Sequence, residues 1–488
     1  MTVHQFANIV KAELPYTANP QQEALIASLA RFCAGLRQPA DSPGTSYTPS
    51  ADRTFVINGY AGTGKTSLTS ALVRALTKLK IKVVLMAPTG RAAKVFNNFS
   101  GFPASTIHRR IYRHSLRGEI PGLKENRDNN TLYIVDEASM ISSAPLSGSS
   151  NSDLLTDLLT YVFAGTNNRL ILMGDTAQLP PVGLSESPAM SVQNLRNLGL
   201  KVSAATLTQV ARQGARSGIL ANAINIRRTM LTHPDRIPKP IVDRFGDVHT
   251  VVPEDMAEAI DSAYRTHGLD NTIIITRSNR RAADFNKAIR NEVLYYDEEL
   301  HVDEPLLIVK NNYYWTRVNR RRDIDFIANG DIMRIARIIG TESRYGFRFA
   351  DVELIPAETG SSSGQSSSDE PIPPIQTKIF LETLASDHPA LPNERLRQLY
   401  ESLVRKEYFN SPDPLHNLAD DPYWNALQAK YAYCITCHKA QGGQWSHVFV
   451  DISYINPEAL GPELYRWMYT ATTRAQHHLS FLTDSRDI

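Results

Sequence analysis

Eight consecutive residues, Gly59 to Thr66, have the types and spacing of a phosphate-binding loop. The segment GYAGTGKT follows the apolar run TFVIN and precedes SLTSALVRALTKL, a run compatible with a helix. Glycines let backbone N–H groups turn toward phosphates, and the N-terminus of a helix adds a favourable dipole. In such a loop the lysine reaches the β and γ phosphates, and the next hydroxyl binds Mg²⁺. We therefore predict nucleotide contacts from Gly59, Ala61, Gly62, Thr63, Gly64, Lys65, Thr66 and Ser67, with Thr66 also binding the metal.

Two adjacent carboxylates, Asp136 and Glu137, close the apolar run TLYIV. Asp136 would hold Mg²⁺, directly or through its waters, and Glu137 would act as general base on the attacking water. Taken alone, such a pair can also be a helix-capping feature. Beside a phosphate-binding loop, it predicts hydrolysis of a nucleoside triphosphate, with ATP and Mg²⁺ as the expected ligands.

Short apolar runs must position these residues. They are rich in Val, Ile and Leu and alternate with helical segments: TFVING, KVVLMAPT, TLYIVDE, RLILMGD, NTIIITR and HVFVDIS. Runs of this kind are typical of the buried strands of parallel sheets, whose ligands bind at the carboxyl ends of the strands. The sequence therefore predicts an α/β fold with parallel sheets. Gln178, which follows the run RLILM, is placed to sense a γ-phosphate at an adjacent strand end.

The composition predicts a folded protein of several domains. The chain has 488 residues, of which 42% are hydrophobic. With a net charge of only +2, a nucleic-acid binder must concentrate Lys and Arg in a groove. The first residues lack a signal-peptide pattern, no stretch is long enough to span a bilayer, and three cysteines are too few for a disulfide framework. We therefore expect a cytoplasmic protein without membrane contacts, with polar loops at residues 38–52, 142–153 and 358–374.

Further motifs extend through nearly the whole chain. They are Tyr16–Ala24, Ala87–Lys94, Ser105–His108, Gly174–Gly183, Leu207–Gln213, Thr276–Arg280 with Asn286 and Arg290, Ala328–Asp331, Thr436–Gln444 and Tyr469–Ala475. This set closely resembles the motifs of superfamily 1B DNA helicases, in the branch that includes RecD and Dda. The resemblance implies two RecA-like motor domains with ATP between them. It also implies an ATP-dependent DNA helicase that translocates 5′ to 3′ on single-stranded DNA and unwinds duplex DNA.

The resemblance assigns roles to single residues. Arg212 and Arg474 would direct positive charge at the γ-phosphate, as arginine fingers do, and would complete a catalytic set with Lys65, Glu137 and Gln178. Gln21 stands three residues before Ala24, as the adenine-reading glutamine of the family does. A glutamine amide can pair with both the donor and the acceptor on the adenine edge. Gln22 remains an alternative for this role, and a plain helix start is another.

Contacts to the nucleic-acid strand are implied at strand ends, where hydroxyls, amides and imidazoles suit phosphate binding. The implied residues are Pro88, Thr89, Thr106, His108, Thr436 and His438. A single histidine such as His108 could instead be structural. The expected first motor domain is residues 1–205, with a β pin insertion at about 101–130, for which a solvated charged loop is the alternative. The expected second motor domain is 206–298 plus 425–488, and 299–424 would form an SH3-like β insertion with a Ser-rich loop and a helical extension.

Other functions remain open alongside the helicase. The segment Cys434-Ile-Thr-Cys-His438 has the spacing of a c-type haem attachment site, but haem attachment requires export, and three cysteines leave no second pair for zinc. On one strand, two residues three apart would point to opposite faces. The alternatives to a helicase are a translocase subunit of a nuclease or DNA-remodelling complex and a nucleotide-dependent switch. We expect a monomer that binds single-stranded DNA and duplex junctions, with possible partners from DNA repair, recombination or replication; the sequence does not distinguish DNA from RNA.

Overall fold

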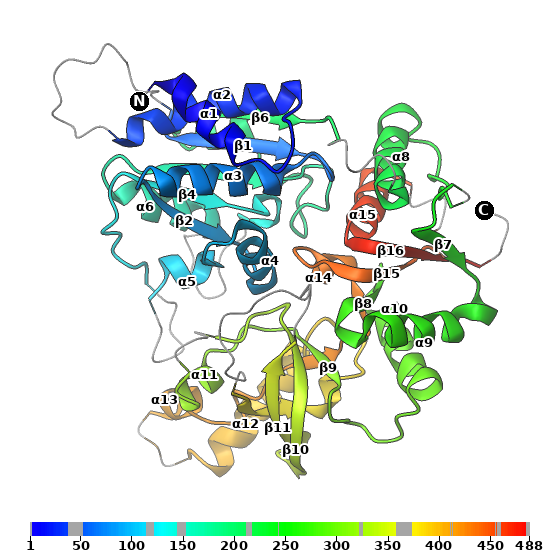
Figure 1. Ribbon diagram of the computed structural model, residues 1–488. Coiled ribbons are helices and arrows are strands. Elements are labelled where there is room, and N and C mark those ends of the chain that lie inside the picture. Colours follow the sequence, from blue (N-terminus) through cyan, green and yellow to red (C-terminus); the bar gives the residue numbers. More distant parts are fainter. Residues whose placement is uncertain are drawn as a thin grey trace. The chain divides into compact units, whose positions relative to one another are not determined.

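The computed structural model is shown in Figure 1. It describes residues 2–37, 52–113, 122–143, 153–210, 217–242, 244–321, 326–357, 373–409, 411, 413–453, 455 and 460–484. The chain divides into two compact units. The first holds the described residues within Met1–Arg113, Ile120–His233 and Pro462–Thr470, and the second holds those within Pro234–Gly461 and Ala471–Ile488.

A parallel sheet forms the centre of the first unit. Its strands are β1 (Thr54–Gly59), β2 (Lys82–Ala87), β3 (Ala104–Thr106), β4 (Thr131–Val135), β5 (Arg169–Gly174) and β6 (Val202–Leu207). Among the described residues these six strands lie in the order β3-β2-β4-β5-β1-β6, and every neighbouring pair is parallel. The carboxyl ends of all the strands therefore lie at one edge, as the apolar runs predict.

Helices cover both faces of this sheet (Figure 1). They are α1 (Val3–Ala12), α2 (Pro20–Ala34), α3 (Lys65–Lys78), α4 (Gly90–Ser100), α5 (Ile107–Ile111), α6 (Leu154–Ala164) and α7 (Val192–Asn197). The same unit also contains α8 (Gly218–Thr232) and most of α15 (Pro462–Thr472). Along β1, Phe55 and Ile57 pack with α1, α2 and α3, whereas Val56 packs on the opposite face with α5, α6 and α7. This alternation is the two-residue period of a strand buried on both faces.

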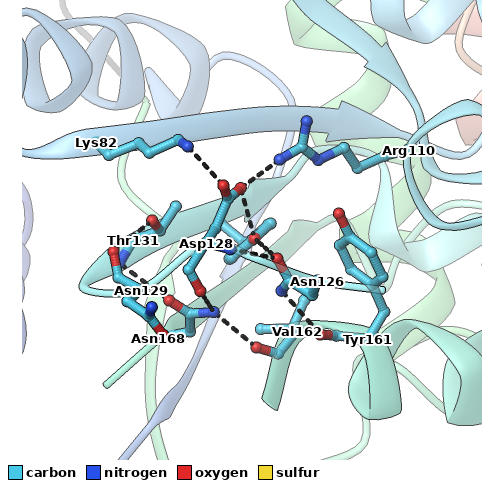
Figure 2. A network of polar contacts seen from close by, with 10 residues as sticks. Lys82, Arg110, Asn126, Asp128, Asn129, Thr131, Tyr161, Val162 and Asn168 are labelled. Atoms are coloured by element: carbon cyan, nitrogen blue, oxygen red, sulfur yellow. Dashed lines mark hydrogen bonds and ion pairs between the residues drawn. The ribbon is translucent and has the colours of Figure 1, made fainter. Parts of the chain in front are cut away.

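A polar network at the amino ends of the strands anchors the segment predicted as a pin. Figure 2 shows Lys82 and Arg110 directed at the Asp128 carboxylate, and the Lys82 Nζ–Oδ1 distance is 2.5 Å. Asn168 donates to the backbone carbonyl of Asp128 at 2.8 Å, and Asn126 accepts from the Asp128 N–H at 3.0 Å. Burial would raise the pKa of Asp128, but hydrogen bonds from Lys82 and Tyr133 and the charge of Arg110 lower it overall. The carboxylate therefore stays ionised and links Arg110 of α5 to Lys82 at the start of β2.

Two residues within the segment predicted as a pin pair in an antiparallel manner. Tyr112 and Leu123 form an antiparallel bridge, and the Arg113 N–H donates to the Gly122 carbonyl at 2.9 Å. Residues 114–121, where the tip of the predicted pin would be, lie outside the described residues.

The second unit contains a parallel and an antiparallel sheet. The parallel sheet is β7 (Val248–Val251), β8 (Thr272–Thr276), β14 (Cys434–Thr436), β15 (Trp445–Asp451) and β16 (Ala475–Leu482), in the order β14-β8-β15-β16-β7. The antiparallel sheet is β9 (Pro305–Ile308), β10 (Ile332–Arg344), β11 (Phe347–Pro356), β12 (Ile375–Phe380) and β13 (Ala429–Tyr431), in the order β12-β11-β10-β9-β13. The helices are α9 (Met256–His267), α10 (Asn279–Ala288), α11 (Tyr314–Val318), α12 (Asn393–Lys406), α13 (Pro414–Ala419) and α14 (Cys437–Ala440). One continuous apolar core joins the two sheets.

Within residues 299–424, the expected helical extension contains α12. The run that begins after Tyr345 forms the strand β11. Tyr345 and Gly346 both have positive φ angles, +56° and +79°, as the two-residue turn of a hairpin between β10 and β11 requires. The Ser-rich stretch lies outside the described residues.

Two expected boundaries differ from the observed units. Residue 205 falls inside β6, which pairs with β1, and the first unit continues through α8 to His233. Residue 424 precedes β13, which pairs with β9, so the antiparallel sheet extends past the expected end of the insertion. Both differences arise because pairing with a distant strand, which no local pattern records, decides where a sheet ends. In the part of the chain that the structure describes, no helix combines the length and apolar content needed to cross a membrane.

Candidate functional site

The predicted phosphate-binding loop connects β1 to α3. A Cβ at Gly59 would lie 2.7 Å from the Lys65 side chain, and a Cβ at Gly64, where φ is +80°, would lie 2.5 Å from the Tyr16 hydroxyl. The left-handed backbone at Gly64 favours glycine, and a side chain at Gly59 would require Lys65 to move. Lys65 begins α3, and its ammonium donates to the carbonyl of Gly59 and, at 3.1 Å, to that of Tyr60. Because Gly64 offers no side-chain cap, the first turn of α3 keeps backbone N–H groups for a ligand.

Helix α2 braces the loop from the side. Gln22 is only 1% exposed, and its amide donates to the Thr63 carbonyl at 3.0 Å. Gln21 instead contacts the end of β6, where its Oε1 accepts from the N–H groups of Thr208 and Gln209, both at 2.9 Å. Its Nε2 donates to the Thr208 hydroxyl at 2.9 Å. The two glutamines thus lie at different places, and the role of Gln21 in adenine binding stays a prediction.

The carboxylates that follow β4 lie at the same sheet edge. Burial and the neighbouring Glu137 charge raise the pKa of Asp136 to about 7. The hydrogen bond from the Glu137 N–H and the charge of Lys65 act in the opposite direction and lower this pKa. Lys65 is therefore within electrostatic reach of Asp136. The Glu137 N–H donates to the Asp136 carboxylate at 2.8 Å, and Glu137 has a positive φ of +51°, which is uncommon outside glycine.

Thr66 and Asp136 fit a magnesium ion by their chemistry. A hydroxyl and a carboxylate are the hard oxygen ligands that Mg²⁺ prefers, and burial leaves the Asp136 carboxylate in need of a cation. Among the described residues, no group of three or more His, Cys, Asp and Glu side chains could hold a metal.

Gln178 lies beyond the end of β5 and lines a cavity. Its side chain is 7% exposed, and its Oε1 has no hydrogen-bond partner among the described residues. The Ser139 hydroxyl and the Arg466 Nε are likewise buried without partners. The cavity has a volume of about 360 Å³, and its lining includes Tyr60, Ser139, Asp175, Gln178, Arg227 and Arg466. Unpaired buried polar atoms are costly, so they mark places where a ligand or water can complete the hydrogen bonds.

A tyrosine hydroxyl connects the loop to the segment after β5. Tyr469 on α15 accepts from the Ala61 N–H and donates to the Asp175 carboxylate, both at 2.7 Å. The adjacent Thr470 hydroxyl accepts from the Leu179 N–H at 2.8 Å. Sequence reasoning assigned no role to Tyr469, although it opens the motif that ends at Ala475. Only the folded chain brings the two motifs together.

The candidate strand contacts of the first unit follow β2 and β3. Pro88 and Thr89 come directly after β2, and Thr106 ends β3, beside Ala87 in the register. The hydroxyls of Thr89 and Thr106 each cap a helix, accepting from the N–H groups of Ala92 and Arg109. Their hydroxyl protons can still be donated to a ligand. Burial lowers the pKa of His108, which favours its neutral form.

The remaining candidates belong to the second unit or lie outside the described residues. Thr436 ends β14 opposite Thr276, and His438 follows in α14. Arg474 is buried just before β16, at the amino ends of the strands, whereas Thr436 lies at their carboxyl ends. The Arg474 guanidinium donates to the Gly443 carbonyl at 3.2 Å. Arg212 lies outside the described residues.

The two cysteines near this site do not share a strand. Cys434 lies on β14, whereas Cys437 begins α14, so the expectation that both belong to one strand is wrong. Both thiols are buried, and desolvation raises the pKa of Cys437 to about 12. A protonated thiol is a poor metal ligand.

Two family models match the chain. An AAA domain matches residues 45–233, and a UvrD-like helicase C-terminal domain matches residues 431–482. A phosphate-binding loop at the edge of one parallel sheet, with a second parallel sheet in another unit, is the architecture of a nucleotide-dependent protein with two α/β units.

Named relatives agree with this class. The ATP-dependent RecD2 DNA helicase of Deinococcus radiodurans is 36% identical over 179 residues, which are 35% of this chain and 21% of that protein. The ATP-dependent DNA helicase dda of Enterobacteria phage T4 is 25% identical over 313 residues, 62% of this chain and 66% of that protein. A crystal structure of Pif1 helicase from Bacteroides, with ADP-AlF3 and single-stranded DNA, has a TM-score of 0.43 and 15% identity, covering 89% of each chain. Over these segments the chain is similar to ATP-dependent DNA helicases of the RecD and Dda type, which supports a superfamily 1B helicase. Its match spans about a fifth of the length of RecD2.

Proposed function

We propose that this chain is an ATP-dependent DNA helicase that translocates 5′ to 3′ on single-stranded DNA and unwinds duplex DNA. The observation that carries the proposal is the grouping of Lys65, Asp136 and Gln178 at one edge of one parallel sheet. A phosphate-binding loop, a metal-binding carboxylate and a sensor of the γ-phosphate make up the hydrolytic part of such a motor. The names of the relatives RecD2 and dda support DNA as the substrate.

Hydrolysis in this proposal uses the side chains of the chain as follows. Thr66 and Asp136 hold Mg²⁺, which would neutralise charge on the β and γ phosphates. The unpaired Oε1 of Gln178 orients the attacking water, and Glu137 accepts the water proton as the oxygen bonds to the γ-phosphorus and ADP leaves. Lys65, Arg212 and Arg474 supply positive charge to the transition state, while Gln21 contacts adenine.

The strand path and the insertions complete the proposal. Pro88, Thr89, Thr106, His108, Thr436 and His438 contact the strand. The antiparallel bridge of Tyr112 and Leu123 supports a β pin at 101–130, and the antiparallel sheet within the second unit supports an SH3-like insertion. We further propose a division into two RecA-like domains, action as a monomer, and partners from DNA repair or replication.

The test is the rate of ATP hydrolysis with and without single-stranded DNA and RNA. We expect strong stimulation by DNA in the wild type and its loss in Lys65→Ala and Arg474→Ala, since removing an arginine finger costs roughly 10³ to 10⁵ in rate. Lys80→Ala, at an exposed lysine beyond α3, is the control and should keep the wild-type rate.

Strand displacement on duplexes with a 5′ or a 3′ single-stranded tail then tests polarity. Unwinding only from the 5′ tail supports the proposal. Hydrolysis that neither nucleic acid changes would favour a nucleotide-dependent switch. Stimulated hydrolysis without strand displacement would favour a translocase subunit of a larger complex.

A further inference from the structure

Two lysines from different sheets of the second unit line one small pocket. Lys430 lies on β13 of the antiparallel sheet, and Lys439 lies on α14, just after β14 of the parallel sheet. Thr436 lines the same pocket, together with Asn279 and Ser386. Lys430 stands outside all the motifs that the sequence shares with the helicase family, so no motif predicts its role.

A buried asparagine fixes the bend that brings these residues together. The Asn286 amide donates to the carbonyls of Tyr431 and Cys434, at 3.1 and 2.9 Å, and its Oδ1 accepts from the Cys434 N–H at 2.8 Å. These three bonds hold residues 431–434, which connect β13 to β14. The placement of Lys430 beside Thr436 is therefore built into the core and does not depend on a loop tip.

The pocket concentrates positive charge without a paired carboxylate. Among the described residues, no ion pair or side-chain hydrogen bond of the Lys430 ammonium is present, although Asp387 acts on it electrostatically. The Lys439 ammonium donates to the neutral Asn329 side chain. Burial, followed by the charge of Lys430, lowers the pKa of Lys439 to about 8, and burial lowers the pKa of Lys430. An anion in the pocket would raise the pKa of both lysines, because it favours the charged form of each.

We propose that Lys430 and Lys439, with the Thr436 hydroxyl, form a subsite for one backbone phosphate of single-stranded nucleic acid. The proposal rests on the function proposed above and adds Lys430 to it. The pocket volume of about 20 Å³ is room for roughly one water-sized group. A single phosphate oxygen fits this space. Such a contact positions the strand without reading its sequence.

The experiment measures the dissociation constant for an oligodeoxythymidine at several salt concentrations, using the full-length chain. We expect Lys430→Gln to weaken binding roughly tenfold at low salt, as the loss of one charge-assisted hydrogen bond does. The slope of log affinity against log salt should become less steep by about 0.7, the value for one phosphate contact on a single strand. Lys430→Arg should keep most of the affinity and the slope. Lys406→Gln, at an exposed lysine of α12, is the matched control and should change neither.

A second arm identifies the phosphate as part of the strand. One neutral methylphosphonate linkage is moved along the oligonucleotide. At one linkage position the methylphosphonate should weaken binding by the wild type but should not further weaken binding by Lys430→Gln, because that variant already lacks the contact. Equal sensitivity of both proteins at every linkage, or an unchanged salt slope in Lys430→Gln, overturns the subsite. If the wild type itself does not bind single-stranded DNA, the proposed function fails, whatever the variant does.

Discussion

At the scale of single residues, two buried glutamines differ in their hydrogen bonds. Gln22 is buried, but its amide is used by the Thr63 carbonyl and by the cap of α2. Gln178 is buried with an unpaired Oε1 at the wall of a cavity. The first glutamine stabilises the fold of the loop. The second contributes no hydrogen bond through Oε1 to the described structure, as expected of a group reserved for a ligand.

We predict that Gln178→Ala lowers the kcat of DNA-stimulated ATP hydrolysis by roughly 10² to 10³, the usual effect of losing one positioned polar group. The KM for ATP should change little, because the group acts mainly in the transition state. The free energy of unfolding should change little, because the Oε1 makes no hydrogen bond in the fold. Steady-state kinetics and urea denaturation measure the two effects. A large loss of stability with unchanged kcat would make Gln178 a structural residue.

At the scale of elements, the second unit packs histidines where two strands meet a helix. His447 on β15, His478 on β16 and His267 at the end of α9 have ring centroids 5.0 to 5.6 Å apart. Burial, then the charges of His478, His267 and His249, lower the pKa of His447 to about 3. A histidine in the unfolded chain has a pKa of about 6.5. Between about pH 3 and pH 6.5, His447 is therefore neutral in the folded chain but protonated in the unfolded chain.

We predict that this difference makes the fold sensitive to acid. Because the folded pKa is lowered, the stabilisation from His447 is present above about pH 6.5 and is lost progressively as the pH falls toward about 3. Between these values one proton contributes at most about 1.4 kcal/mol per pH unit, and the partial exposure of the ring reduces this. His447→Phe should therefore flatten the pH dependence of the free energy of unfolding measured by urea denaturation. His4→Gln, on the exposed face of α1, is the control. Parallel pH curves for the wild type and His447→Phe would contradict the prediction.

At the scale of the whole molecule, the two compact units have separate apolar cores. The sheet of the first unit packs on both faces against its own helices, and one core joins the two sheets of the second unit. The phosphate-binding loop and both candidate metal ligands belong to the first unit. Nucleotide binding should therefore act first on the stability of that unit.

We predict two separable steps of thermal unfolding, with Mg²⁺-ATP raising the step of the first unit. A ligand at about 100 times its Kd stabilises the state that binds it by about 2.7 kcal/mol. Scanning calorimetry measures the steps, and hydrogen exchange of peptides from β1 and from β11 assigns them. In Lys65→Ala the nucleotide-dependent shift should disappear. A single cooperative step, or a shift confined to the second unit, would be the contrary result.

The sequence by itself determined the features encoded within about ten residues. The loop Gly59–Thr66, the carboxylates after TLYIV and the strand runs were predicted from spacing and periodicity, and each expected run within the described residues forms a strand of a parallel sheet. The helical extension within residues 299–424 was also predicted, and α12 forms there, because its pattern of charged and apolar residues is local.

The tertiary structure alone decided what depends on residues far apart in the chain. Strand pairing placed β6 with β1 and β13 with β9, so the observed sheets end elsewhere than the sequence-based boundaries at 205 and 424. The Tyr469 bridge from Ala61 to Asp175 and the pocket shared by Lys430 and Lys439 join segments from separate elements. No local pattern records such contacts, because they form only when packing of the core fixes which strands and helices are neighbours.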